Sequence, residues 1–192
     1  TSQHDKNRIY VAFNHHKYGD FKPYIFMTED MGNTWKTISN NLPNRGSVYA
    51  IEEDHEDPGL IFCGTEFGVF FSPNNGKNWK ELSMGLPTIA VRDIAIQREM
   101  NDLVLGTFGR GFYVLDDYSM LRSVENKQVQ EKAMILPIRD AIMWEKSNPL
   151  GLPGKSFQGD NFYVGENLDP VAMINYYYSE SFKSLKDKRR DN

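Results

Sequence analysis

The sequence contains little cysteine, no long hydrophobic segment and no strong charge of either sign. Cys63 is the single cysteine among 192 residues, so a small secreted domain held together by internal disulfides is excluded. No apolar run approaches the roughly 20 residues that a membrane-spanning helix needs. The formal net charge is −4, so the overall charge gives no indication of binding to nucleic acid or to an anionic membrane.

The two ends of the sequence look like cuts within a longer protein. The chain does not begin with Met, and only a few polar residues precede the strand-like segment RIYVAFN. It stops within the charged segment KSLKDKRRDN, which we expect to be solvated. The missing signal peptide therefore says nothing about the compartment in which the protein works.

What the sequence does contain is a repeat of strand-like segments. LIFCGTEFGVFF begins at Leu60 and LVLGTFGRGFYV begins at Leu103, so the two align without a gap at a shift of 43. The unit around the first of them predicts four strands, VYAIEED, LIFCGTE, GVFFSPN and NWKELSM. An earlier copy contains RIYVAFN, PYIFMTED and NTWKTISNNLP, with an insertion, HHKYGDFK, between its first two strands. Units of this length with four strands are typical of β-propeller blades.

A shorter pattern occurs twice between predicted strands, as TEDMGNTWK at residues 28–36 and SPNNGKNWK at residues 72–80. In the first copy we expect Asp30 to accept hydrogen bonds from nearby backbone N–H groups and Gly32 to supply a positive φ. We also expect the Thr34 hydroxyl to form a local hydrogen bond and the Trp35 ring to cover the turn. The second copy keeps the same turn with Ser72, Asn74, Gly76 and Trp79, whereas a third copy, FYVLDDYSM, retains only an acid at Asp116 or Asp117.

These motifs resemble those of a known group of proteins. The segment from Thr28 to Trp35 matches the Asp-box of bacterial neuraminidase repeats, Ser/Thr-x-Asp-x-Gly-x-Thr-Trp, and the second copy departs from it at Asn74 and Asn78. The segment VRDIAIQREMNDLVLGTFGRGFYVLDD is similar to the closing blade of bacterial exported proteins that carry sortilin-like or neuraminidase-like propeller repeats. That group is often labelled glycosyl hydrolase, and the resemblance covers about residues 8–117.

The resemblance implies an all-β fold and a fragment of a longer propeller. Residues 1–117 are expected to form its last two to three blades, and residues 118–146 a connector with a possible closing strand. Residues 147–170 have a Gly/Pro-rich linker composition, and residues 171–192 are expected to begin a second, immunoglobulin-like domain with a charged tail. The resemblance also implies a periplasmic, cell-surface or secreted location.

Few residues are candidates for binding or chemistry. Arg110 lies between Gly109 and Gly111, and it is expected either to meet a carboxylate or phosphate of a ligand or to pair with Asp116 or Asp117. The neighbouring residues His15 and His16 fall in the predicted insertion, where a solvated loop is favoured over a metal site. The tyrosines at 176–178 are expected to pack within a strand.

The leading functional hypothesis is a non-catalytic scaffold that binds protein, peptide or glycan, with the rest of its own propeller as a further partner. The alternative is a glycoside hydrolase of sialidase type, which the family label suggests. Such an enzyme needs paired carboxylates and, by resemblance, an arginine cluster with a tyrosine nucleophile. No catalytic residue, metal ligand or cofactor is assigned, because nothing in the sequence shows that its candidate side chains converge; these are Arg8, Arg45, Glu66, Arg92 and Arg110. A third hypothesis is a purely structural spacer.

Overall fold

The computed structural model describes residues 1–83, 85–124, 133–141, 143–145, 170–178 and 189. The chain divides into two compact units, Thr1–Lys132 and Ala133–Asn192. The described residues are mostly β-structure in small antiparallel sheets, with two short 3-10 helices. Neither helix has the length or apolar character needed to cross a membrane. The described residues form no closed propeller ring.

The first unit contains three sheets, each built from strands that are consecutive in the chain. The first sheet contains β1 (Ile9–His15), β2 (Asp20–Thr28) and β3 (Lys36–Thr37). The second contains β4 (Val48–Glu53), β5 (Ile61–Thr65), β6 (Gly68–Ser72) and β7 (Lys80–Glu81). The third contains β8 (Val91–Gln97), β9 (Asp102–Thr107) and β10 (Phe112–Leu115). The helices are η1 (His16–Tyr18) and η2 (Tyr118–Ser123).

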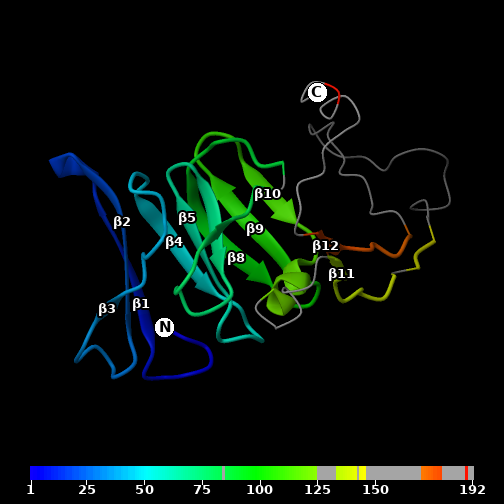
Figure 1. Cartoon of the computed structure of the whole chain (residues 1–192), viewed down its shortest axis with the longest axis horizontal. Helices are drawn as coiled ribbons and strands as arrows, with labels where there is room; N and C mark the ends of the chain where they lie inside the picture. The colour runs from blue at the N-terminus through cyan, green and yellow to red at the C-terminus, as the bar shows by residue number, and fades with distance from the viewer. Residues whose placement is uncertain (84, 125–132, 142, 146–169, 179–188, 190–192) are drawn as a thin grey trace, which may run out of the picture. The chain divides into compact units, whose positions relative to one another are not determined.

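The three sheets lie against one another as successive layers, from the blue strands through the cyan strands to the green strands (Figure 1). Strand β4 of the middle sheet lies next to both β1 and β8. Every residue of β5 is buried, because the middle sheet is covered on both faces. The core between the first two sheets joins Ile25 and Met27 of β2 to Ile61 and Cys63 of β5. Burial of these side chains provides the main favourable free energy for holding the sheets together.

The layers approach closely where a glycine permits it. A Cβ added to Gly64 on β5 would lie 2.7 Å from the carbonyl oxygen of Val91 at the start of β8. Real Cβ atoms do not come that near to a backbone oxygen, so the second and third sheets can pack this tightly only because residue 64 has no side chain. The alternation of apolar residues predicted the strands, and the close approach of Gly64 to Val91 shows how the second and third sheets stack.

The pairing corrects the alignment of the repeats. Val48 pairs with Thr65 and Ala50 with Gly64, and the third sheet has the same bulge, with Val91 opposite Thr107 and Asp93 opposite Gly106. The gap-free shift of 43 is therefore wrong within β5 and β9, because Gly64 corresponds to Gly106 at a shift of 42. The turn before β10 is one residue longer than the turn before β6, which restores the original shift.

The first sheet is equivalent to the last three strands of the second sheet. Ile9 pairs with Thr28 just as Ile61 pairs with Ser72, so β1 corresponds to β5 and β2 to β6. The predicted insertion HHKYGDFK forms the end of β1, the helix η1 and the start of β2. The first sheet therefore has no counterpart of β4, and the third has no counterpart of β7 among the described residues.

The second unit contains one pair of strands among its described residues. Strand β11 (Ala133–Ile135) pairs antiparallel with β12 (Tyr176–Tyr178), and Leu136 N–H donates to the carbonyl oxygen of Asn175 at 2.9 Å. The predicted tyrosine strand therefore has a partner, the segment AMI, which belongs to this unit. The predicted linker lies outside the described residues except for Pro170, and so does the charged tail except for Arg189.

Candidate functional site

The first box turn, residues 28–35, is organised around one carboxylate. The Asp30 Oδ1 atom accepts from the Thr34 N–H at 2.8 Å and from the Thr28 hydroxyl at 2.7 Å, while Oδ2 accepts from the Thr34 hydroxyl at 2.6 Å. Thr28 in turn accepts from the Gly32 N–H at 2.9 Å. The bonds from Thr34 and Thr28 to the charged form lower the pKa of Asp30 to about 2. The arrangement holds a hairpin corner, and both carboxylate oxygens of Asp30 accept bonds within the turn.

The second box turn, residues 72–79, repeats this geometry with an amide. The Asn74 Oδ1 atom accepts from the Asn78 N–H at 2.8 Å and from the Ser72 hydroxyl at 3.0 Å, and Ser72 accepts from the Gly76 N–H at 2.9 Å. Both turns have two successive residues at positive φ, Met31 and Gly32 in one and Asn75 and Gly76 in the other. Two successive positive φ values are typical of a type I′ β-turn, here within a longer connection between the strands.

The tryptophans of the two box turns have different environments. Trp79 is 4% exposed, and its indole N–H donates to the carbonyl oxygen of Ile38 in the first sheet at 2.7 Å. Trp35 is 44% exposed and donates to Gly32 within its own turn at 3.0 Å. Trp79 thus joins the second box turn to the neighbouring sheet, whereas Trp35, at the equivalent position of the first box turn, is partly exposed to solvent. Both turns are structural elements of the stack.

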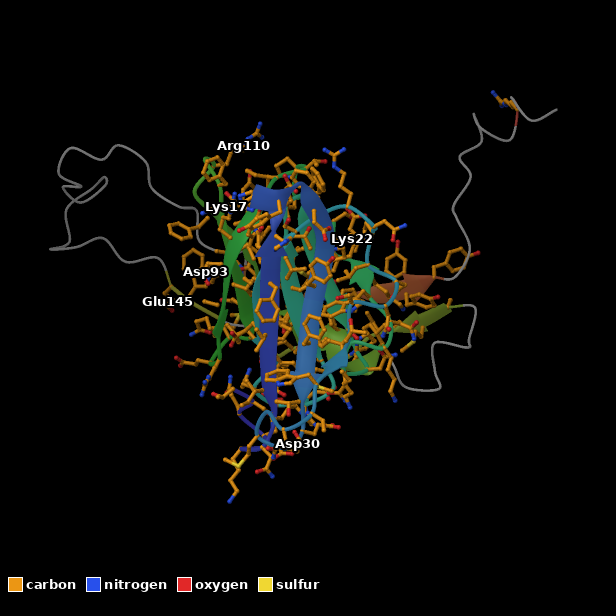
Figure 2. The ribbon with its side chains drawn as sticks, turned by 90° about the vertical axis from the view of Figure 1, so that its left-hand side faces the viewer. Lys17, Lys22, Asp30, Asp93, Arg110 and Glu145 are labelled. Carbon is orange, nitrogen blue, oxygen red and sulfur yellow. The ribbon has the colours of Figure 1, made fainter. Side chains whose placement is uncertain are left out.

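The box turns and the hairpin tips lie at opposite ends of the sheets. The box turn with Asp30 lies at one end, whereas Lys17, Lys22 and Arg110 point toward the other (Figure 2). That second end contains the β1–β2, β5–β6 and β9–β10 hairpin tips of the three sheets. Gly46 N–H donates to the Phe21 carbonyl oxygen at 2.8 Å, and Phe108 N–H donates to the Ala90 carbonyl oxygen at 2.9 Å. We name it the arginine–aromatic end, and its members are Phe21, Arg45, Tyr49, Phe67, Arg92, Phe108 and Arg110.

Aromatic rings position two of its arginines. The Arg92 guanidinium lies 3.7 Å from the centroid of Tyr49 and 5.3 Å from that of Phe108, between a strand of the second sheet and a turn of the third. Arg45 lies 5.6 Å from the ring of Phe21. Stacking leaves the in-plane N–H donors of a guanidinium free, so these side chains can still bind a carboxylate or phosphate with two parallel bonds.

Arg110 lies at the tip of the turn between β9 and β10, where Gly109 and Gly111 have φ of 85° and 68°. The turn is held by the Thr107 hydroxyl, which donates to the Gly111 carbonyl oxygen at 2.7 Å. The predicted pairing with Asp116 or Asp117 is wrong, because those acids follow β10 at the opposite end of the hairpin. None of the ion pairs between described residues involves Arg45, Arg92 or Arg110.

Two buried polar atoms without a hydrogen-bond partner lie at the same end. The Ser47 hydroxyl is fully buried, and the Oε2 atom of Glu66 is also buried. The two residues are adjacent in the fold, since the Glu66 N–H donates to the Ser47 carbonyl oxygen at 3.0 Å. An acceptor and a hydroxyl left without partners cost free energy unless water or a ligand satisfies them. The arginine–aromatic end therefore contains two buried polar atoms whose hydrogen-bonding capacity is unmet among the described residues.

A second polar cluster was not predicted from the sequence. Asp54 is fully buried and accepts two bonds from the Arg122 guanidinium, at 2.7 and 2.9 Å, and one from the Tyr118 hydroxyl at 2.5 Å. Burial would raise the pKa of Asp54, but its bonds to Arg122 and Tyr118 outweigh burial and lower it. The Tyr118 ring packs edge-on against Phe62. Because every lone pair of this carboxylate has a protein donor nearby, the cluster anchors η2 to the loop after β4.

The remaining candidate residues do not come together in one site. His15 stacks on Tyr18, and His16 contacts Asn14 through its side chain, both on the exposed tip of the first hairpin. Arg8 pairs with Glu29 and Glu53 at 3.6 Å, away from the other arginines. The part of the chain that the structure describes contains no group of three or more His, Cys, Asp or Glu placed to hold a metal. No protein-family model and no curated protein matches this sequence.

Proposed function

We propose that this chain is a non-catalytic binding scaffold and that the arginine–aromatic end takes an acidic ligand. The observation that carries the proposal is Arg92, which is stacked between Tyr49 and Phe108 and has no carboxylate partner among the described residues. Arg45, beside Phe21, and Arg110, at the β9–β10 tip, add two further guanidinium groups at this end of the sheets. The ligand is then a peptide, protein or glycan that bears carboxylate groups.

We further propose that the three sheets are blades of a larger Asp-box, sortilin-like propeller from an exported bacterial protein. The support is the meander order within each sheet, the shared bulge of β4 and β8, and the two equivalent box turns. In this proposal the second unit begins an immunoglobulin-like domain, for which the β11–β12 pair is the available support. The protein would then work in the periplasm, at the cell surface or outside the cell.

The sialidase-type alternative has one specific observation in its favour. Arg92, Arg110 and the carboxylate of Glu66 lie at one end of the sheets, and a sialic acid carries the carboxylate that such arginines bind. A hydrolase of this kind would also need a second acid and a nucleophile near the same sugar. The two proposals therefore agree on the binding surface and differ in whether bond cleavage follows binding.

The experiment measures binding of two probes to the whole chain, a glutamate-rich peptide and sialyllactose. We expect Arg92→Ala to weaken the peptide complex about 10- to 100-fold, because one charge-assisted contact is worth about 1.5–3 kcal/mol. Lys77→Ala is the matched control, since it removes one exposed positive charge at the opposite end of the sheets, in the second box turn. Equal weakening by both substitutions, or no binding of either probe, contradicts the proposal. Turnover of a fluorogenic sialoside would favour the hydrolase.

A further inference from the structure

The hairpin tip of the first sheet is longer than its counterpart in the second sheet. The pair of Phe13 with Tyr24 in the first sheet is equivalent to the pair of Thr65 with Gly68 in the second, because both lie four residues beyond the matching pairs at the box turns. Two residues close the hairpin of the second sheet after that pair, whereas residues 14–23 close the hairpin of the first. We name residues 14–23 the long tip.

The long tip is ordered by its own contacts. The ring of His15 stacks on that of Tyr18, with 4.5 Å between the centroids. The carboxylate of Asp20 accepts from the Tyr24 hydroxyl at 2.6 Å and from the Lys22 N–H at 3.1 Å, so the one acid of the long tip is bonded locally. A segment already held in one conformation loses less entropy when it binds a partner.

The long tip adds exposed cations to the arginine–aromatic end. Lys17 and Lys22 are exposed and point toward the end of the sheets that contains Arg110 (Figure 2). Neither lysine belongs to an ion pair between described residues. Tyr18, between them in the sequence, is 81% exposed. The long tip therefore presents two ammonium groups and a ring to solvent.

Contacts join the long tip to the tips of the other two sheets. The carbonyl oxygen of Phe21, in the long tip, accepts from Gly46, and its ring lies 5.6 Å from the Arg45 guanidinium. A Cβ added to Gly46 would lie 3.4 Å from the ring of Phe67. Arg92 continues the series between rings of the second and third sheets. Packed sheets are about 10 Å apart, so crossing all three takes about 20 Å, the length of about six extended residues.

We propose that the acidic ligand is an extended peptide segment that crosses the tips of all three sheets, and that the long tip determines its specificity. This inference rests on the proposed function, because it names the ligand of the same end. Residues i, i+2 and i+4 of an extended chain lie on one face. The segment therefore carries acidic and apolar residues alternately at every second position, the acids for the lysines and arginines and the apolar residues for the exposed rings.

The exposed rings favour a peptide over a glycan. Phe67 is 42% exposed and Phe108 is 70% exposed, and neither ring can form a hydrogen bond with a sugar hydroxyl. Aromatic residues and arginine are the residue types that dominate the centres of protein interfaces. Apolar side chains of a peptide would cover these rings while its carboxylates meet the neighbouring arginines.

The first experiment compares two end-capped peptides of identical composition, ESLSESLSE and ELSSELSSE, by fluorescence anisotropy with the whole chain. Both carry their acids on one face, but only the first carries its leucines on that same face. We expect the first peptide to bind about tenfold more tightly, since its leucines reach the rings. Trigalacturonate, which also carries three carboxylates, should compete poorly with it.

The second experiment tests the long tip. Lys17→Ala/Lys22→Ala should weaken binding of ESLSESLSE about five- to tenfold, the effect of two exposed charge pairs, and leave the short peptide ESL unchanged. Lys6→Ala/Lys77→Ala is the matched control, because both lysines are exposed and lie at the box-turn end.

The outcomes separate this inference from the proposed function. If Arg92→Ala weakens binding but the two long peptides bind equally, or the long-tip variant behaves like its control, this inference is wrong and the proposed function stands. Binding of trigalacturonate as tight as that of ESLSESLSE overturns the assignment to a peptide. If no acidic peptide and no acidic sugar binds, both proposals are wrong.

Discussion

At the scale of single residues, the box turns depend on one acceptor at the corner. Asp30 and Asn74 present the same oxygen to the same backbone N–H, at 2.8 Å in each case. Only Asp30 can titrate, and its pKa of about 2 lies below the value of about 3.9 that an unfolded chain would show. A group with a depressed folded pKa contributes stability that is fully present above the unfolded value and is lost as the pH falls toward the folded value.

We therefore predict that Asp30→Asn removes part of the acid sensitivity of the first unit. The wild-type free energy of unfolding should fall as the pH drops from about 4 to about 2, and the variant should fall less, because an amide at this corner does not take up a proton. Asn74 shows that an amide is compatible with the turn. The measurement is the urea midpoint between pH 2 and pH 6, with Asp116→Asn as control. Parallel curves for the wild type and Asp30→Asn would contradict the prediction.

Local hydrogen bonds explain why the box turns could be predicted from the sequence. Every group in the box turn lies within eight residues, so the roles of Asp30 and Gly32 follow from turn chemistry. The stacking of Arg92 on Tyr49 and Phe108 could not be predicted in the same way. It depends on which strand positions of two different sheets lie side by side. A one-residue error in the register, such as the gap-free alignment made, turns every side chain of a strand to the other face.

At the scale of elements, the Asp54 cluster connects η2 to the second sheet. The two bonds from Arg122 join residues 68 positions apart, and the Arg122 Nη2 atom also donates to Asn101 at 2.7 Å. The sequence indicated a connector after residue 117 and gave no sign of this anchor. A single Asp in a loop and a single Arg in a connector form no pattern until the fold brings them together.

Arg122→Ala should destabilise the first unit by roughly 3–5 kcal/mol, because it leaves a buried carboxylate without its charged partner. Arg98→Ala removes a more exposed arginine and should have a small effect. The measurement is urea unfolding followed by tyrosine and tryptophan fluorescence, with amide exchange across residues 118–123 as a second readout. A loss below about 1 kcal/mol, the value typical of an exposed pair, would show that water replaces Arg122 at Asp54.

At the scale of the whole molecule, the repeat allows the strands of one sheet to be matched, position by position, with the strands of the next. The sequence indicated short strands in repeating units, and the mostly β fold agrees with that expectation. It did not indicate that the first sheet begins at the equivalent of β5, because RIYVAFN and VYAIEED have the same alternation. A Cβ added to Gly64 on β5 would meet Val91 of the next layer, whereas the nearest atoms to a Cβ on its counterpart Gly106 in β9 belong to Asp93 of its own sheet. The two glycines thus occupy equivalent strand positions, but only at Gly64 does another sheet supply the nearest atoms.

This difference gives a prediction that compares the two positions directly. Gly64→Ala should destabilise the chain by about 1–3 kcal/mol, because the new methyl group would lie 2.7 Å from the carbonyl oxygen of Val91 and the layers must move apart. Gly106→Ala should change the free energy of unfolding by less than about 1 kcal/mol, since the nearest atom to the new methyl group is the Asp93 Cβ at 3.3 Å, within its own sheet. Urea unfolding of both variants under identical conditions measures the difference. Equal losses would mean that the tight contact between the second and third sheets does not restrict the size of the side chain at residue 64. A large loss at Gly106 alone would mean that the outer face of the third sheet is covered in solution.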